Sequence, residues 1–223
     1  MSLKALIPVR AGSDRVKNKN IRPFAGSNLL EIKIKQLQRI DGIEEICVNS
    51  DCDRMLELAK KLGATPIKRD PYFASSTVPM NEVWTNLAKN MDCTDILYTN
   101  VTNPLVADST YEKFINQWKL KKTNNDSSFD SITSVHEVVE YLWEKSAAIN
   151  YDPNYHPRSQ DLPRYYGLNF AINIIPKNIM ISRSNIVARK FLPIFMSKFE
   201  SIDIDELEDF ALAELIYKAR KND

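Results

Sequence analysis

The feature of this sequence that most constrains its fold is the alternation of short apolar segments with longer amphipathic ones. Leu3–Val9 is a short apolar run that predicts a strand, and Leu29–Ile40 has apolar residues at nearly helical spacing. Strands that alternate with helices predict an α/β fold, in which a mostly parallel sheet is covered by helices on both faces. The alternation continues through strands at Ile43–Val48, Ala64–Lys68 and Asp95–Asn100, and helices at Arg54–Leu62 and Glu82–Asn90.

The second half of the chain is less regular. Ser109–Lys122 and Glu206–Arg220 predict helices, whereas Asn150–Pro163 is rich in Pro, Asn, Asp and Arg and predicts a long loop or an arm. We therefore expect a single domain over residues 1–223, with an arm within it at about residues 130–175. The remaining expected elements are a loop at Thr123–Ser128 and strands at Ile132–Val135, Leu142–Trp143 and Leu168–Ile175, with a last short strand ending at Ile204.

Composition excludes several classes of protein. The net charge of +1 gives no argument for a nucleic-acid or membrane partner, and no apolar stretch approaches the roughly 20 residues of a membrane span. Three cysteines without CxxC spacing and only two histidines argue against a zinc site. The odd cysteine count and the lack of a signal peptide favour a cytoplasmic location.

The charge is distributed unevenly along the chain. Residues 1–35 contain eight Lys and Arg, and residues 200–223 contain eight Asp and Glu. A basic segment can bind phosphates and an acidic one can bind a divalent cation, while a solvated charged surface is the alternative for both.

The first polar loop, IPVRAGSDRVKNKNIRPF, directly follows the first predicted strand. Ligands of parallel sheets bind at the carboxyl ends of the strands, so this loop lies where a site is expected. Gly12 allows the backbone to approach a ligand closely, and Ser13 and the loop amides can bond phosphate oxygens. The spacing is neither that of a Walker P-loop nor GxGxxG. The positive charges of the loop are Arg10, Arg15, Lys17 and Lys19, and a basic surface loop is the alternative interpretation.

The same loop resembles the IPARxGSKxxPxKNI signature of the acylneuraminate cytidylyltransferases, which make CMP-activated sialic acids and related nonulosonic acids. The resemblance implies a Rossmann-like nucleotidyltransferase fold in which the loop binds the triphosphate of CTP. One departure is Asp14, which stands where the family usually has a lysine. The nucleotide-binding residues that the resemblance implies here are Arg10, Gly12, Ser13, Arg15, Lys19 and Asn20.

Two further segments resemble the family at the expected intervals. KRDPYFASS is similar to its RRPxxLAxD segment, so Arg69 would meet the cytosine. YTNVTNPLV is similar to LQPTSPLR, which adds Asn100 and Thr102 to the nucleotide site. The departures here are Asn100 for glutamine, Asn103 for serine, and Met80 in a stretch where the family often has serines.

The stretch HPRSQDLPRYYGLNFAINIIP resembles the family's R-x-Q-x-L-P followed by NGAIYI. The resemblance implies that Arg158, Gln160 and Asn169 bind the sugar, with Phe170 in place of a glycine. It also implies an arm that reaches over a partner subunit. Because this region is rich in aromatic residues, which interfaces favour, we expect a homodimer. A solvated loop is the alternative for Arg158.

The acidic segment SIDIDELEDF offers a metal site. Asp203 and Asp205 are two residues apart, so on a strand both would face one side and could bind Mg²⁺ beside a triphosphate. The resembling family places its metal-binding aspartates in a matching D-x-D. The alternative for Asp205 is the N-cap of the last helix, with Glu208 completing a capping box, and both roles are compatible.

The predicted function is transfer of CMP from CTP to an acidic sugar with release of pyrophosphate, in cell-surface polysaccharide synthesis. Arg10, Lys19, Asp203 and Asp205 are the predicted catalytic residues, with Mg²⁺ as cofactor. A different sugar acid, or a nucleotide-binding protein that has lost catalysis, are the alternatives. The motif departures that favour these alternatives are Asp14, Met80, Asn100, Asn103 and Phe170.

Overall fold

The computed structural model describes residues 2–13 and 15–221. The helices are α1 (Leu29–Leu37), α2 (Asp53–Lys61), α3 (Met80–Lys89), α4 (Asp108–Thr123), α5 (Lys177–Arg183) and α6 (Leu207–Lys221), with 3-10 turns η1 (Lys19–Ile21), η2 (Pro71–Ala74) and η3 (Ser159–Asp161). The strands are β1 (Leu3–Pro8), β2 (Pro23–Phe24), β3 (Ser27–Asn28), β4 (Glu45–Ser50), β5 (Thr65–Lys68), β6 (Asp95–Thr99), β7 (Ser131–Val138), β8 (Trp143–Glu144), β9 (Ala147–Ala148), β10 (Tyr165–Pro176) and β11 (Phe191–Phe195).

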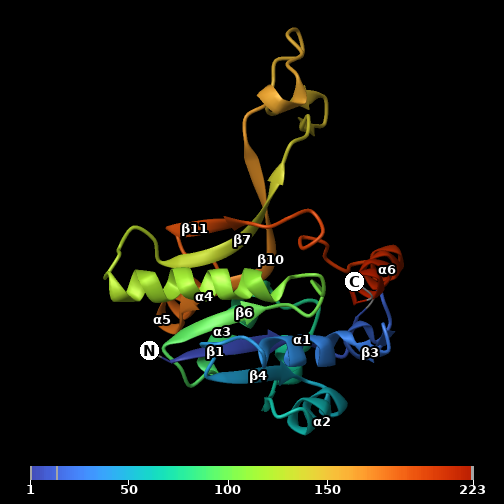
Figure 1. The fold of residues 1–223 in the computed structure, drawn as a ribbon, viewed down its shortest axis with the longest axis vertical. Helices are drawn as coiled ribbons and strands as arrows, with labels where there is room; N and C mark the ends of the chain where they lie inside the picture. The colour runs from blue at the N-terminus through green and yellow to red at the C-terminus, as the bar shows by residue number, and fades with distance from the viewer. Residues whose placement is uncertain (1, 14, 222–223) are drawn as a thin grey trace.

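A seven-stranded sheet in the order β11-β7-β10-β6-β1-β4-β5 forms the centre of the molecule (Figure 1). β1 pairs in parallel with both β4 and β6, and β5 pairs in parallel with β4. Because these four strands run the same way, their carboxyl ends meet at one edge of the sheet. The predicted α/β fold with a mostly parallel sheet is confirmed.

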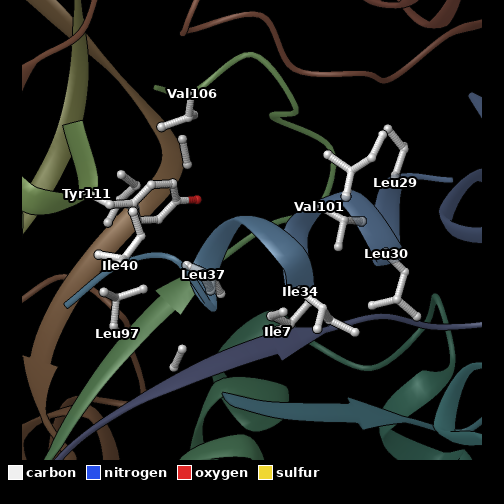
Figure 2. Packing of buried hydrophobic residues seen from close by; sticks show 14 of the residues in the cluster. Ile7, Leu29, Leu30, Ile34, Leu37, Ile40, Leu97, Val101, Val106 and Tyr111 are labelled. Carbon is white, nitrogen blue, oxygen red and sulfur yellow. The ribbon is translucent and has the colours of Figure 1, made fainter. Parts of the chain in front are cut away.

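Each face of the sheet has its own hydrophobic core, because neighbouring strand residues point to opposite faces. Ile7 of β1 belongs to the core that α1 and α4 cover, and its neighbour Leu6 belongs to the core that α3 and α5 cover. Figure 2 shows the first core, where Leu30, Ile34 and Leu37 of α1 face the sheet. The apolar spacing predicted for this helix is therefore the face that it buries.

β10 is the strand that departs from the parallel pattern. It runs antiparallel to β6 on one side and to β7 on the other. Its register with β7 shifts between Leu168 and Asn173. Within this irregularity Phe170 has φ 53°, in the left-handed region that favours glycine. The family that the sequence resembles has a glycine in place of Phe170. In this chain a large side chain therefore stands on a backbone conformation that glycine adopts most readily.

An arm projects from the sheet between β7 and β10 (Figure 1). Val138 still pairs with Tyr165, so the arm comprises residues 139–164. This is narrower than the expected 130–175, because both ends of that range are strands of the central sheet. Rings pack against one another inside the arm: the centroids of Tyr141 and His156 are 4.5 Å apart, and the Trp143 indole N–H donates to the Tyr151 hydroxyl at 2.8 Å.

Three local differences from the sequence-based expectations concern the last third of the chain. α5 was not predicted, because seven residues are too few to show a helical period. β11 was not predicted because it contains Pro193, which is tolerated since β11 lies at the edge of the sheet. The expected short strand ending at Ile204 is wrong: residues 202–205 have no regular structure, and the Ile204 N–H donates to the carbonyl of Thr102.

Among the helices of the described residues, none has the length and apolar character that a membrane crossing requires.

Candidate active site

A cavity of about 600 Å³ lies at the carboxyl ends of β1 and β6, beside the segments that follow β1 and β5. Most of the predicted nucleotide-binding residues line it, although they come from segments far apart in the sequence. The polar loops that follow the strands therefore converge, as the topology of a parallel sheet requires. The predicted residues that line the cavity are Arg10, Gly12, Ser13, Arg15, Lys19, Asn20, Arg69 and Asn100. Asp14 lies outside the described residues.

The loop after β1 is fixed by hydrogen bonds from beneath. The Ala11 N–H donates to the Asp51 carboxylate at 3.0 Å, and the buried Asn20 amide donates to the Arg10 carbonyl at 3.1 Å. Asn20 thus supports the loop, while a Cβ added to Gly12 would meet nothing within 4 Å. The loop is held on its inner side and open on its outer side. Asp51 was not among the predicted site residues, although it directly follows β4.

Arg69 supplies a fixed cation inside the cavity. It is buried, and its Nε and Nη2 donate to the side chain and the backbone carbonyl of Asn49 at 2.6 and 2.9 Å. Burial lowers the pKa of Arg69 below its ordinary value, but a guanidinium stays charged at any physiological pH. Apolar side chains lie beside it in the same cavity, namely Val78, Val83, Leu87 and Tyr98. A cation next to an apolar wall suits a planar, polar ring.

Arg10 and Met80 stand on the same cavity. The Arg10 guanidinium donates to the carbonyl of Ala74 at 3.0 Å, which ties the first loop to η2. Met80, a departure from the family pattern, is half-exposed and contributes to the lining at the start of α3.

The acidic segment lies against the basic end of the cavity. Lys19 donates to the carbonyl of Ile204 at 2.5 Å, and Arg15 lies 2.6 Å from the carboxylate of Asp205 and 3.2 Å from that of Glu206. Neither Asp203 nor Asp205 lines the cavity itself, but Arg15 and Lys19 line it and contact this segment. The predicted metal-binding residues and the predicted phosphate-binding residues are therefore neighbours.

Asp203 is the more enclosed of the two aspartates. Burial raises the pKa of its carboxyl, while the Thr102 hydroxyl acts in the opposite direction. Within the described part of the chain its Oδ1 is buried and has no hydrogen-bond partner. Burial also lowers the pKa of the nearby Lys19.

The capping role considered for Asp205 is wrong. α6 begins at Leu207, and the carboxylate that accepts from the preceding backbone is that of Asp209, which bonds the N–H groups of Asp205 and Glu206 at 3.0 and 2.7 Å. The capping-box partner is therefore Asp209 and not Glu208. Asp205 turns to Arg15 instead, because an opposite charge from the other end of the chain lies within reach.

The loop after β6 divides its residues between two tasks. Asn100 lines the cavity, and its amide lies 3.4 Å from the Phe170 carbonyl. Thr102 faces the acidic segment, and the buried Asn103 donates to the carbonyl of Ile202 at 3.2 Å. The loop therefore positions Asp203 as well as part of the cavity. Lys33, which the sequence did not single out, is fully buried beneath it and donates to the Asn103 carbonyl at 3.2 Å.

The predicted sugar-binding residues do not line the cavity. Arg158 and Gln160 are exposed on the arm, where Arg158 pairs with Asp161 at 2.9 Å. Asn169 is buried, accepts from the Ser134 hydroxyl at 2.5 Å and bonds Ser201 at 3.2 Å. The next residue, Phe170, packs near Trp84 of α3, with ring centroids 6.5 Å apart.

Comparison with known proteins places this arrangement in a family. The model of the cytidylyltransferase family matches residues 4–221. This chain belongs to the cytidylyltransferases. It is 27% identical to the pseudaminic acid cytidylyltransferase of Campylobacter jejuni subsp. jejuni serotype O:2, over 96% of this chain and 95% of the relative. It is also 27% identical to the CMP-N,N'-diacetyllegionaminic acid synthase of Legionella pneumophila, with the same coverage of both chains.

Solved cytidylyltransferase structures share the fold. A CMP:2-keto-3-deoxy-manno-octonic acid synthetase complexed with CTP superposes with a TM-score of 0.71 at 12% identity, over 99% of this chain and 100% of the other. The predicted family and fold class are thus confirmed. Cytidylyltransferases generally use a divalent metal. In residues 2–13 and 15–221 no group of three or more His, Cys, Asp and Glu is arranged to hold a metal ion.

Proposed function

We propose that this cytidylyltransferase transfers CMP from CTP to an acidic sugar of the nonulosonic type and releases pyrophosphate. The observation that carries the proposal is a cavity whose lining brings together the cations Arg10, Arg15, Lys19 and Arg69 with an apolar wall. Its relatives bear the names of enzymes for pseudaminic and legionaminic acid, which supports an acceptor of that class.

Different parts of the cavity lining suit different parts of the nucleotide. The triphosphate would lie on the first loop, where Ser13 and the backbone above Gly12 face open space. The cytosine would lie between the apolar wall and Arg69, whose orientation is set by its two hydrogen bonds to Asn49. A cation whose position is fixed in advance selects a base better than a mobile one, because no side-chain order is lost on binding.

Asp203 and Asp205 are the proposed ligands of Mg²⁺. The donor set fits a hard cation, since both are carboxylates and the buried Asp203 Oδ1 lacks a hydrogen-bond partner among the described residues. When bound, the ion would neutralise charge on the phosphates.

The chain's own residues supply positioning and charge rather than a covalent intermediate. A hydroxyl of the acceptor attacks the α-phosphorus, the bond to the β-phosphate oxygen breaks, and pyrophosphate leaves while the hydroxyl proton passes to water. Arg10 and Lys19 stabilise the negative charge that develops on the phosphates. Lys19 is held for this role by the Ile204 carbonyl.

The acceptor site needs groups from the arm. Arg158 and Gln160 would bind the carboxylate and hydroxyls of the sugar, and the exposed Tyr155, Tyr165 and Tyr166 suit an interface with a second copy. We therefore propose that the chain forms a two-fold homodimer, in which the arm of one copy completes the cavity of the other. The side-chain oxygen and nitrogen of Asn169 both form hydrogen bonds, so Asn169 would hold the irregular part of β10 beside this site. The proposal includes a cytoplasmic location, which is typical of the family.

The decisive experiment is an acceptor panel. The purified chain is incubated with CTP, Mg²⁺ and pseudaminic, legionaminic, N-acetylneuraminic or 3-deoxy-manno-octulosonic acid, and pyrophosphate release and CMP-sugar formation are measured. We expect CTP-dependent product with at least one nine-carbon acid, and little with ATP, GTP or UTP. If Mg²⁺ and CTP raise the melting temperature selectively but no acid is converted, the chain is a nucleotide-binding protein without this activity.

A further inference from the structure

Residues proposed to bind phosphate and a residue proposed to bind metal contact each other in the structure. Arg15 belongs to the first loop and lines the cavity, yet its guanidinium contacts the Asp205 carboxylate at 2.6 Å and that of Glu206 at 3.2 Å. Lys19 lies 3.9 Å from the same Asp205 oxygen. The contact joins residues 190 positions apart, so it fastens the first loop to the segment before α6.

This contact excludes two others. A carboxylate oxygen that accepts a hydrogen bond from a positively charged guanidinium is a poor ligand for a metal ion. The Arg15 N–H groups that face Asp205 and Glu206 are, in turn, not available to a triphosphate. The two aspartates therefore differ: Asp203 has an unpartnered Oδ1 within the described residues, whereas Asp205 is occupied by an internal cation.

The contact is also weak enough to be exchanged. Arg15 and Asp205 have side chains that are 56% and 49% exposed, and ion pairs at such sites are screened by water and salt. A triphosphate, with several charges, outcompetes a single carboxylate for a guanidinium, which binds phosphate in a bidentate manner.

We propose that Arg15 couples metal binding to nucleotide binding, by passing from Asp205 to the triphosphate and so freeing Asp205 for the metal. The inference rests on the proposed function, and within it makes Arg15 a positioning residue. It follows that the nucleotide-free chain binds a divalent cation weakly. By linkage, the factor by which CTP strengthens metal binding equals the factor by which metal strengthens CTP binding.

The test is a Mn²⁺ titration followed by electron paramagnetic resonance, in which the signal of free Mn²⁺ falls on binding. It is run without and with saturating CTP, in the absence of any acceptor. We expect R15Q to bind Mn²⁺ about fivefold or more tightly than wild type without nucleotide, and to show a smaller strengthening by CTP. Lys17→Gln is the matched control, since it removes one charge from the same loop and Lys17 is exposed. In the titration without nucleotide, the effect of Lys17→Gln on Mn²⁺ affinity should be less than half that of R15Q.

A double-mutant cycle with Asp205→Asn decides whether the effect passes through Asp205. We expect R15Q to leave Mn²⁺ affinity unchanged in the D205N background. Equal tightening in both backgrounds, or no tightening in either, overturns the proposal, and melting curves verify that each variant is folded. Wild-type turnover with the acceptor panel tests the proposed function separately, because the Mn²⁺ titration requires no acceptor.

Discussion

The two regions proposed above as the nucleotide side and the acceptor side of this molecule are built in different ways. On the nucleotide side, four parallel strands deliver their following segments to one edge, and residues from Arg10 to Asn100 meet in one cavity. On the acceptor side, Arg158 and Gln160 stand on a projecting arm and Asn169 is buried beside β7. The comparison teaches that strand order suffices to assemble the first site. The second depends on where the arm is placed.

The largest effect is expected from Asp203→Asn, which tests whether Asp203 holds the metal on the nucleotide side. An amide is a poor ligand for a hard cation, so kcat should fall by about 100-fold or more. The melting temperature should stay the same or rise slightly, because burial already disfavours the charged carboxyl of Asp203. Activity is measured over a Mg²⁺ titration beside melting curves.

Asp209→Asn is the matched control for that variant. Asp209 lies in the same acidic segment but accepts backbone N–H groups, a role that an amide oxygen can keep. Equal losses in the two variants would mean that the segment matters through general charge and not through Asp203.

The second prediction concerns the support beneath the nucleotide side. Lys33 is fully buried and donates to Gln36, to the Asn103 carbonyl and to Tyr111, and burial lowers its pKa from 10.5 to about 7. Between these values the unfolded chain binds more protons than the folded one. Between pH 7 and 10.5 the free energy of unfolding should therefore rise with pH, and Lys33 contributes at most about 1.4 kcal/mol per pH unit to this rise.

Denaturant unfolding between pH 7 and about 8.5 measures that slope, and comparison of wild type with a Lys33 variant cancels the contribution of the unfolded thiols, which titrate near about 8.5. Lys33→Met should flatten it and raise stability at pH 7. Lys35→Met is the control, because Lys35 is exposed on the same helix and pairs with Glu31. If K33M and wild type keep the same slope, Lys33 is not the group that titrates.

The third prediction tests the acceptor side. Arg158→Ala should raise the KM for the sugar acid by about 10–100-fold, the value of a charge-assisted hydrogen bond, and leave the KM for CTP unchanged. Its contact with Asp161 is exposed, so the fold should be little affected. Lys145→Ala, on the exposed turn of the arm, is the control for a general loss of charge.

Mixing two impaired variants, at a sugar concentration well below the KM of Arg158→Ala, shows which cavity the arm serves. If the arm acts on a second copy, combining Arg158→Ala with Asp203→Asn restores part of the activity, because one cavity of the mixed dimer then has both residues. Absence of restoration in a dimer that is shown to exchange subunits would assign the arm to its own chain.

The smallest effect is expected where the two sides meet, at Phe170. Phe170→Gly and Phe170→Ala both remove the ring, but only glycine is at ease at φ 53°. The glycine variant should therefore be more stable than the alanine variant by about 1 kcal/mol. The same pair at Leu168, which is not among the residues with positive φ, should show the opposite order, by about 0.5–1 kcal/mol. Matching orders at both positions would contradict the strained backbone.

The sequence was sufficient for the parts of the molecule that local patterns encode. The spacing of Leu30, Ile34 and Leu37 predicted a buried helical face, and the polar loop after Leu3–Val9 predicted one wall of the cavity. Both follow from short-range rules: helical period, and the position of loops after parallel strands.

The features that the sequence did not predict depend on partners far away in the chain. Asp205 looked like a helix cap because Glu208 follows it at the right spacing, but Arg15 lies within bonding distance only in the folded molecule. Asn103 stands where the resembling family has a serine, and nothing in the local sequence indicated that its amide donates to the Ile202 carbonyl. Both contacts join segments that are distant in the sequence.

The pairing of Val138 with Tyr165 has a consequence for how such a chain can diversify. The arm leaves the sheet and returns to it on two neighbouring strands, so residues 139–164 form a cassette with adjacent ends. Replacing the cassette by a short turn, or by the corresponding segment of a relative, should alter neither the order of the strands nor the loops that follow β1, β4, β5 and β6. If Arg158 and Gln160 bind the acceptor as proposed, such an exchange should change the range of accepted sugars and leave the residues proposed for the nucleotide in place.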